Sequence, residues 1–433
     1  MKKNLLNTLI CAAIGLFSLQ ASAENLQNIY QLALKKDPLV LRAAAQRDAS
    51  NAAIDISKAS FLPSIGFTSR VDKERTSTSQ ATGSFGTSYS NSISLQQSLF
   101  DWSDWSKLST AEKQALQSQT SYNATIQGLI VRVAQAYFNV LSANDDLTFV
   151  VAEKRAVERQ LEQTKQRFAV GLTAITDVHE AQAQYDSVVA REIAATNALE
   201  NAKEALQEIT GEYHSQLSPL NTAVFKATAP QPANAVDWVA LAEENNLDLK
   251  VRKLAVEIAQ NNIDIADAGH YPTLDLTANK RLGDSSDTLQ RDTDSVGLAL
   301  TVPLYTGGAT SANQDVQRAN YVAASEDLEL GHRSVLRQTR SFYNTVGANI
   351  AGIKALEQAV ISAESALKAT EAGFEVGTRT IVDVLISTQN LFNARRNLTK
   401  ARYDYILAVL QLKQAAGTLT EEDLALINRS LSA

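Results

Sequence analysis

The sequence predicts an α+β membrane protein in which four strands per chain contribute to a sheet shared by several chains, and long helices continue from it. Three observations carry this prediction. One unit occurs twice along the chain, four stretches alternate between apolar and polar residues, and two helical segments are too long for a compact domain to cover. These elements suit a tube better than a soluble enzyme.

The internal two-fold repeat is visible in residues that recur at a nearly constant distance. The pairs of identical residues that lie 206 positions apart are Phe168/Phe374, Val170/Val376, Gly171/Gly377, Ile175/Ile381, Asp177/Asp383, Val178/Val384 and Gly211/Gly417. Other pairs recur at 205 (Arg132/Arg337, Asn139/Asn344) and at 209 (Pro63/Pro272, Thr68/Thr277). So small a drift indicates one architecture used twice, over residues 24–220 and 221–433.

Residues 1–23 have the features of a secretory signal peptide. Lys2 and Lys3 form a charged start, residues 5–19 an apolar stretch, and residues 21–23 a cleavage site of small residues. The alternative is an N-terminal membrane anchor, for which the apolar stretch is short. Cys11 lies in this segment, so the mature chain from residue 24 has no cysteine and forms neither a disulfide nor a thiolate metal site.

Charge and hydropathy limit the partners of the mature chain. Removing Lys2 and Lys3 changes the formal charge from -7 to -9 (-7 - 2 = -9), which disfavours nucleic acid. After residue 23, no apolar run is long enough for a membrane-spanning helix, so membrane contact requires strands.

Each repeat begins with helices in this prediction. Residues 24–33 form a short helix, and Asp37 and Pro38 start a second one, since Asp caps helices and Pro suits the first turn. This helix runs to about Ser60, and Pro63 marks the exit to extended chain.

Four stretches then take a two-residue period, at about 64–75 and 88–100, and at about 272–283 and 293–305. Apolar residues occupy alternate positions, such as Ile65 and Phe67, Ile93 and Leu95, Leu274 and Leu276, and Val296, Leu298 and Leu300. About 9–11 residues with one apolar face fit a tilted transmembrane strand. A half-buried sheet of a soluble protein has the same pattern.

Two further features favour a membrane sheet. The connections at about 73–88 and 283–294 are rich in Ser, Thr, Gly and Asp, as exposed loops are. Aromatic residues cluster where strands meet helices, as in an interfacial girdle or at a packed strand–helix corner: Phe61, Phe100, Trp102, Trp105, Tyr271 and Tyr305.

Four strands cannot close a barrel, and an open edge in lipid leaves backbone groups unpaired. Several chains must therefore share one barrel. Two chains give about 8 strands, whose interior side chains fill, whereas three give about 12 and leave a conduit.

A long helix follows each second strand, at about 104–168 and 309–374, and a return helix follows at about 173–210 and 380–416. Each long helix spans roughly 95 Å. Its apolar residues keep a three–four spacing that predicts coiled-coil packing; in the first helix they are Ile126, Leu129, Val133, Ala136, Val140, Val150, Val157 and Leu161. Gly171 and Gly377 are placed to end the long helices in a left-handed cap.

At these turns the chain resembles the TolC family of outer-membrane factors (outer membrane efflux proteins). The resemblance covers essentially the whole mature chain and is densest at residues 168–178, FAVGLTAITDV, and 376–385, VGTRTIVDVL. It implies a homotrimer sharing one 12-stranded transmembrane β-barrel, continued by a long periplasmic α-helical coiled-coil barrel that is closed at its tip. The implied location is the outer membrane of a Gram-negative bacterium, extending into the periplasm.

The resemblance also implies function and partners. A duct of this family does no bond chemistry and has no cofactor. It docks with a periplasmic membrane-fusion adaptor and an inner-membrane pump of RND, ABC or MFS type, and exports drugs, small toxic compounds or proteins, the last by type I secretion.

Four residues match the family's gate. Thr176 and Asp177 correspond to residues that accept hydrogen bonds from the arginine matching Arg379. The family's usual tyrosine is Phe374 here, so its hydroxyl link to the aspartate cannot form and the closed state is expected to rest on Arg379 alone. The alternative is that Arg379 is a surface arginine on a turn.

Asp383 matches a lumen carboxylate that recurs three times around the trimer axis. Such a ring favours cations, and mutual repulsion would raise the apparent pKa values. The family's second aspartate is Ile386 here, so the ring would hold three carboxylates instead of six. Alternatively, Asp383 caps a helix, because Thr380 and Asp383 have capping-box spacing.

The adaptor-docking tip implied by resemblance comprises Val170, Gly171, Leu172, Thr173, Val376, Gly377 and Thr378, although the glycines also suit plain helix caps. The four histidines, His179, His214, His270 and His332, are scattered and are expected to be surface or packing residues. The sequence predicts no catalytic or metal site. A soluble periplasmic coiled-coil scaffold or adaptor and a secreted hydrolase remain the competing function classes.

Overall fold

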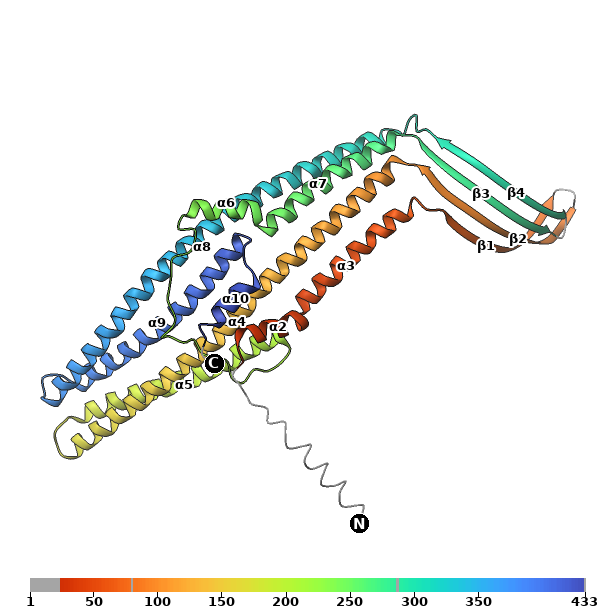
Figure 1. The fold of residues 1–433 in the computed structure, drawn as a ribbon. Coiled ribbons are helices and arrows are strands. Elements are labelled where there is room, and N and C mark those ends of the chain that lie inside the picture. The colour runs from red at the N-terminus through yellow and green to blue at the C-terminus, as the bar shows by residue number, and fades with distance from the viewer. Residues whose placement is uncertain (1–23, 79–80, 286–287, 432–433) are drawn as a thin grey trace, which may run out of the picture.

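The computed structural model describes residues 24–78, 81–285 and 288–431, so the predicted signal peptide lies outside it. The molecule is elongated (Figure 1). A sheet forms one end, two helical hairpins form the other, and short helices surround the middle.

The first half contains α2 (Leu26–Lys36), α3 (Pro38–Ala59), β1 (Ser64–Thr78), β2 (Ala81–Phe100), α4 (Trp102–Ala169) and α5 (Ile175–Thr210). The second half contains α6 (Ala235–Asn245), α7 (Leu247–Asp267), η1 (Ala268–His270), β3 (Thr273–Ser285), β4 (Thr288–Thr301), α8 (Ala309–Glu375) and α9 (Ile381–Ala415). The succession of two helices, two strands and a helical hairpin thus occurs twice. A short helix, α10 (Glu421–Asn428), follows.

Asp37 caps α3 with Pro38 at the first helical positions, as predicted. The backbone N–H of Leu39 donates to Asp37 Oδ1 at 2.7 Å. The other carboxylate oxygen accepts from Arg132 of α4, and the Asp37 side chain is 1% exposed. The cap therefore also fixes the start of α3 against the long helix.

The four strands form one antiparallel sheet in the order β1-β2-β3-β4. One row crosses all four strands, with Ile65 opposite Leu95, Leu95 opposite Ala278, and Ala278 opposite Val296. Directly opposite residues share a face, so the predicted apolar alternation places these side chains on one side. Ile65 is 71% exposed and Val296 79%, so no other described segment covers these side chains.

The predicted loops at 73–88 and 283–294 are wrong for most of their length. β1 and β2 remain paired from Ser64–Gln96 to Thr78–Ala81, and β3 and β4 from Thr273–Thr301 to Ser285–Thr288. Antiparallel pairing is made by backbone groups, and Ser and Thr side chains do not oppose it. The strands therefore continue through polar sequence, and Lys280 pairs with Asp294 across β3 and β4 at 3.0 Å.

Helices α4 and α8 contain 68 and 67 residues, which corresponds to about 100 Å each. Within the described residues, no helix combines the length and the apolar character needed to cross a bilayer. The predicted stripe on α4 is confirmed, since Leu129, Val133, Val150 and Val157 are at most 2% exposed. It packs against α9 and the short helices near mid-molecule, where Tyr137 and Phe138 also lie in the core.

Candidate gate and docking tip

The two hairpin tips end in the same hydrogen-bonded turn. Gly171 and Gly377 take the left-handed conformation, with φ of 76° and 77°. The N–H of Leu172 donates to the carbonyl of Arg167 at 2.8 Å, and the N–H of Thr378 donates to that of Gly373 at 2.8 Å. A glycine in the left-handed backbone conformation, together with a backbone hydrogen bond that spans six residues, defines the Schellman cap. The predicted left-handed glycine caps are therefore confirmed.

Apolar side chains project from these turns. Val170 is 70% exposed, Leu172 75% and Val376 75%. The same caps that close the long helices thus present uncovered apolar groups at the end of the molecule farthest from the sheet (Figure 1).

The predicted gate residues lie on these two tips but do not meet within one chain. Asp177 accepts a hydrogen bond from Thr173 of its own turn, and Thr176 is exposed. Among the described residues, no hydrogen bond or ion pair joins Arg379 to either of them. A link between Arg379 and Asp177 therefore remains a prediction for contact between subunits.

Phe374 has a partner that the sequence did not reveal. The guanidinium carbon of Arg167, on α4, lies 4.5 Å from the centre of the Phe374 ring, on α8. A cation over an aromatic face at this distance is attractive. This contact joins the two hairpins near their tips.

Asp383 forms the predicted capping box with Thr380. Its Oδ2 accepts from the backbone N–H of Thr380 at 2.9 Å and from the Thr380 hydroxyl at 3.0 Å, and the Asp383 N–H donates to that hydroxyl at 3.3 Å. Two hydrogen bonds lower the pKa of Asp383 below its usual value. The larger effect comes from the backbone N–H of Thr380, and the next from the Thr380 hydroxyl. Within one chain this is opposite to the direction predicted for a ring of carboxylates. Ile386, 51% exposed, lies one turn further along the same helix face.

A buried charge cluster lies further up the hairpins. Glu153 of α4 is fully buried and accepts two hydrogen bonds from Arg191 of α5, at 2.8 and 3.0 Å. Arg396 of α9 lies 3.5 Å from the same carboxylate and 3.5 Å from Asp146. Three helices therefore meet at one carboxylate. This cluster was not predicted from the sequence. Glu153 falls on the apolar stripe between Val150 and Val157, and an acidic residue at such a position is the signal that could have revealed it.

The histidines lie apart. His214 is buried against Glu24 and the hydroxyl of Thr210, which fits the predicted packing role. His332 lies at the surface beside Glu243. In the part of the chain that the structure describes, no three histidine, aspartate, glutamate or cysteine side chains gather in a metal-binding arrangement.

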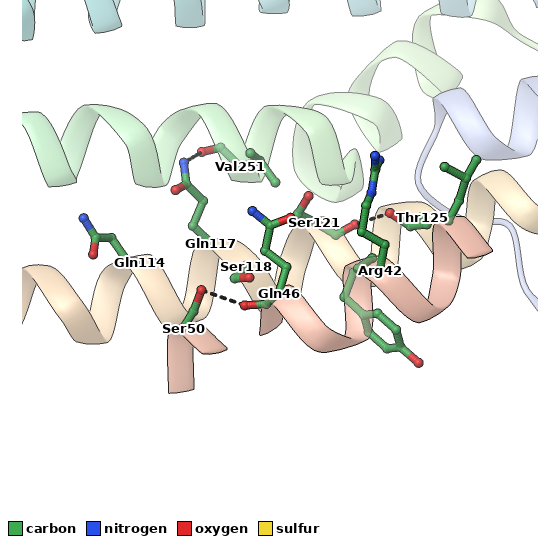
Figure 2. Close-up of a pocket in the computed structure, with 12 residues that line it drawn as sticks. Arg42, Gln46, Ser50, Gln114, Gln117, Ser118, Ser121, Thr125 and Val251 are labelled. Atoms are coloured by element: carbon green, nitrogen blue, oxygen red, sulfur yellow. Dashed lines mark hydrogen bonds between the residues drawn. The ribbon is translucent and has the colours of Figure 1, made fainter. Parts of the chain in front are cut away.

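Several cavities lie along the helices of the described chain. The first, of about 580 Å³, lies between α3, α4 and α7, and Figure 2 shows its lining of amides, hydroxyls and Arg42. Gln117 crosses from α4 to donate to the carbonyl of Val251 at 3.1 Å. The lining residues of this cavity include no carboxylate and no histidine. The second, of about 510 Å³, separates α4 from α8 and α9 and is lined by Phe374.

Comparison with known proteins gives consistent matches. Residues 29–212 and 238–418 match the family described as outer membrane efflux protein. The chain is 47% identical over 436 residues to outer membrane protein TolC of Vibrio cholerae serotype O1, covering 99% of each chain. It is 32% identical over 438 residues to the alkaline protease secretion protein AprF of Pseudomonas aeruginosa, covering 98% of this chain and 91% of AprF.

Solved structures share the fold. The Campylobacter jejuni CmeC outer membrane channel superposes with a TM-score of 0.80 at 17% identity, covering 94% of this chain and 90% of CmeC. At that identity the similarity concerns the fold, a helix-rich chain with a four-stranded sheet.

Proposed function

This chain belongs to the outer membrane efflux protein family, and we propose that three copies of it form one gated conduit through the outer membrane. It is an outer-membrane channel and not an enzyme, and it acts as the exit duct for drug efflux and type I secretion. In the proposed assembly, each chain adds four strands to a 12-stranded barrel, and the helical hairpins form a tunnel in the periplasm.

The observation that carries this proposal is the sheet. Its apolar face is uncovered, with Ile65 71% and Val296 79% exposed, and neither β1 nor β4 has a partner on its outer side among the described residues. In water an exposed apolar face is unfavourable, and in lipid an unpaired strand edge is too. Lipid covers the face, and neighbouring subunits pair the edges.

The test is assembly and conduction by the purified mature protein. We expect the mature protein to occur in the detergent-extracted outer-membrane fraction and to migrate as a heat-sensitive trimer in electrophoresis. We also expect it to form ion channels in planar bilayers. A water-soluble monomer with no affinity for bilayers would contradict the proposal and favour the soluble scaffold.

Docking is proposed to use the exposed tip residues Val170, Leu172 and Val376 together with the turns that carry them. Channels of this family work with adaptor and pump partners. Apolar side chains on rigid Schellman turns suit a protein contact, because little ordering is needed on binding.

Arg379→Ser is expected to give a channel several-fold more conductive than the wild type. Within the chain, Arg379 has no hydrogen-bonding partner among the described residues, so in the closed trimer it is available to Thr176 and Asp177 of the adjacent subunit. Removing it takes away charge-assisted bonds between subunits. Single-channel recording measures the effect, with Arg333→Ser, on an exposed helix face, as the control. Equal conductance of wild type and Arg379→Ser would remove Arg379 from the gate.

Thr380→Val is expected to make cation preference more sensitive to acid. The lowered pKa of Asp383 keeps the carboxylate charged at pH values where an ordinary aspartate is protonated. The channel then prefers cations at all pH values above the usual pKa of an aspartate. This preference is lost only as the pH falls through the lowered pKa of Asp383. Without the Thr380 hydroxyl the pKa rises, and the loss moves to higher pH. Reversal potentials in a salt gradient, measured at decreasing pH, report the change; Asp383→Asn should lack the pH-dependent step, and its persistence there would exclude Asp383 as its origin.

A further inference from the structure

The ring of Phe374 and the guanidinium of Arg167 lie between the two hairpins of one chain. Arg167 is two residues before the end of α4 at Ala169, and Phe374 is one residue before the end of α8 at Glu375. The guanidinium carbon lies 4.5 Å from the ring centre. Both side chains are partly buried. We propose that this pair, here called the tip latch, holds the two hairpins of a subunit together in the closed channel.

Few other polar contacts could hold the two hairpins of a subunit together near their tips. Gln160 Nε2 reaches the Thr388 hydroxyl at 3.4 Å, about two turns from Arg167. Beyond Gln160, toward the tips, no hydrogen bond or ion pair joins the hairpins in the described part of the chain. Phe374 packs at the margin of the apolar cluster that contains Ile381. The tip latch is therefore the last directional contact before the turns.

The internal repeat shows why the two arginines have different tasks. Position 167 corresponds to Gly373, and position 379 to Thr173, in each case at a distance of 206. A Cβ at Gly373 would lie 2.8 Å from Arg379 Cγ, so the missing side chain leaves space for the stem of Arg379 to lie along its own hairpin. Arg167 crosses to the other hairpin instead. One arginine thus binds within the subunit, and the other is left for the neighbour.

Phe374 suits this contact because the ring face alone attracts the cation. The ring carries no ionisable group, so the tip latch does not depend on the protonation of Phe374. Opening the tip separates α4 from α8 and requires Arg167 to leave the ring. This inference rests on the proposed function as a gated channel.

The experiment is a double-mutant cycle read by single-channel conductance in planar bilayers. Arg167→Gln and Phe374→Leu are each expected to raise conductance several-fold, and the double variant no further than the larger single effect, because both changes remove one contact. Arg167→Lys and Phe374→Trp keep a cation and a ring, and should stay close to wild type. Arg159→Gln, which removes a charge from α4 two turns away, is the matched control.

A cross-linking arm locates the contact. Residues 24–433 contain no cysteine, so an Arg167→Cys/Phe374→Cys variant reacts with a short bismaleimide only at these positions. Linkage is expected within one chain, leaving the denatured protein at monomer mass and the channel at low conductance.

Several results would overturn the tip latch. They are unchanged conductance in both single variants, additive effects in the double variant, Arg159→Gln opening the channel equally, or cross-linked dimers. If wild type forms channels and Arg379→Ser opens them while Arg167→Gln does not, only the tip latch fails. If wild type forms no channel, the proposed function fails and the tip latch with it.

Discussion

Glu153→Gln is expected to destabilise the folded chain by about 3 kcal/mol. Removing one member of a buried ion pair leaves the partner charge uncompensated and costs roughly 3–5 kcal/mol. Glu153 is fully buried and faces two guanidinium groups, those of Arg191 and Arg396. Their side chains are 30% and 18% exposed, so water compensates part of the loss and the low end of the range applies.

Thermal unfolding followed by far-UV circular dichroism in detergent measures this change. Glu329→Gln is the control, because Glu329 forms an exposed pair with Arg333 on one face of α8 and such pairs contribute about 0.5 kcal/mol or less. A Glu153→Gln/Arg191→Met double variant should recover part of the lost stability, since one unpaired charge is removed with the other. Equal melting of Glu153→Gln and Glu329→Gln would show that the cluster is not structural.

Gly417→Ala is expected to prevent accumulation of folded protein, with a cost of about 4 kcal/mol or more. A Cβ at this position would lie 2.3 Å from the carbonyl oxygen and 2.4 Å from the carbonyl carbon of Asn245, both backbone atoms. The φ of Gly417 is 70°, a conformation that adds about 1–2 kcal/mol for a residue with a side chain. Because Gly417 follows α9 and Asn245 ends α6, the clash separates these helices.

Two glycines of the same chain separate the causes. Gly307 has a φ of 66° with nothing near its Cβ position, so Gly307→Ala should show only the backbone strain of about 1–2 kcal/mol. Gly347 lies inside α8 with open space around it, and Gly347→Ala should stabilise by roughly 0.5–1 kcal/mol. The yield of folded protein and the melting temperature should both be highest for Gly347→Ala, lower for Gly307→Ala and lowest for Gly417→Ala. Normal yield of Gly417→Ala would exclude the close approach to Asn245.

The helices and their ends could be predicted because their causes are local. Asp37 before Pro38, and glycine after a long apolar periodicity, specify caps through backbone bonds within a few residues. The ends of the strands could not, because pairing across a sheet depends on a partner strand far along the chain, and Ser- and Thr-rich sequence reads equally well as loop. β1 and β2 therefore run well past the predicted boundaries at residues 75 and 88.

The candidate site was predictable in position but not in its contacts. Two copies of one turn identified both tips, and the spacing of Thr380 and Asp383 identified the capping box. The cation–aromatic contact of Arg167 with Phe374 joins residues 207 positions apart (374 - 167 = 207) and leaves no periodic trace. Contacts of this kind depend on how two hairpins lie against each other, which no local pattern specifies.

The order β1-β2-β3-β4 gives the sheet two unlike borders. Closure of the proposed ring therefore joins the β1 border of each subunit to the β4 border of the next, a head-to-tail contact. A chain with a proline placed in the outer backbone ladder of β1 could still offer its intact β4 border, enter a ring and leave one seam unsealed. When such a chain is co-expressed with normal chains, it would act as a dominant-negative subunit, and export would be lost even though normal chains are present.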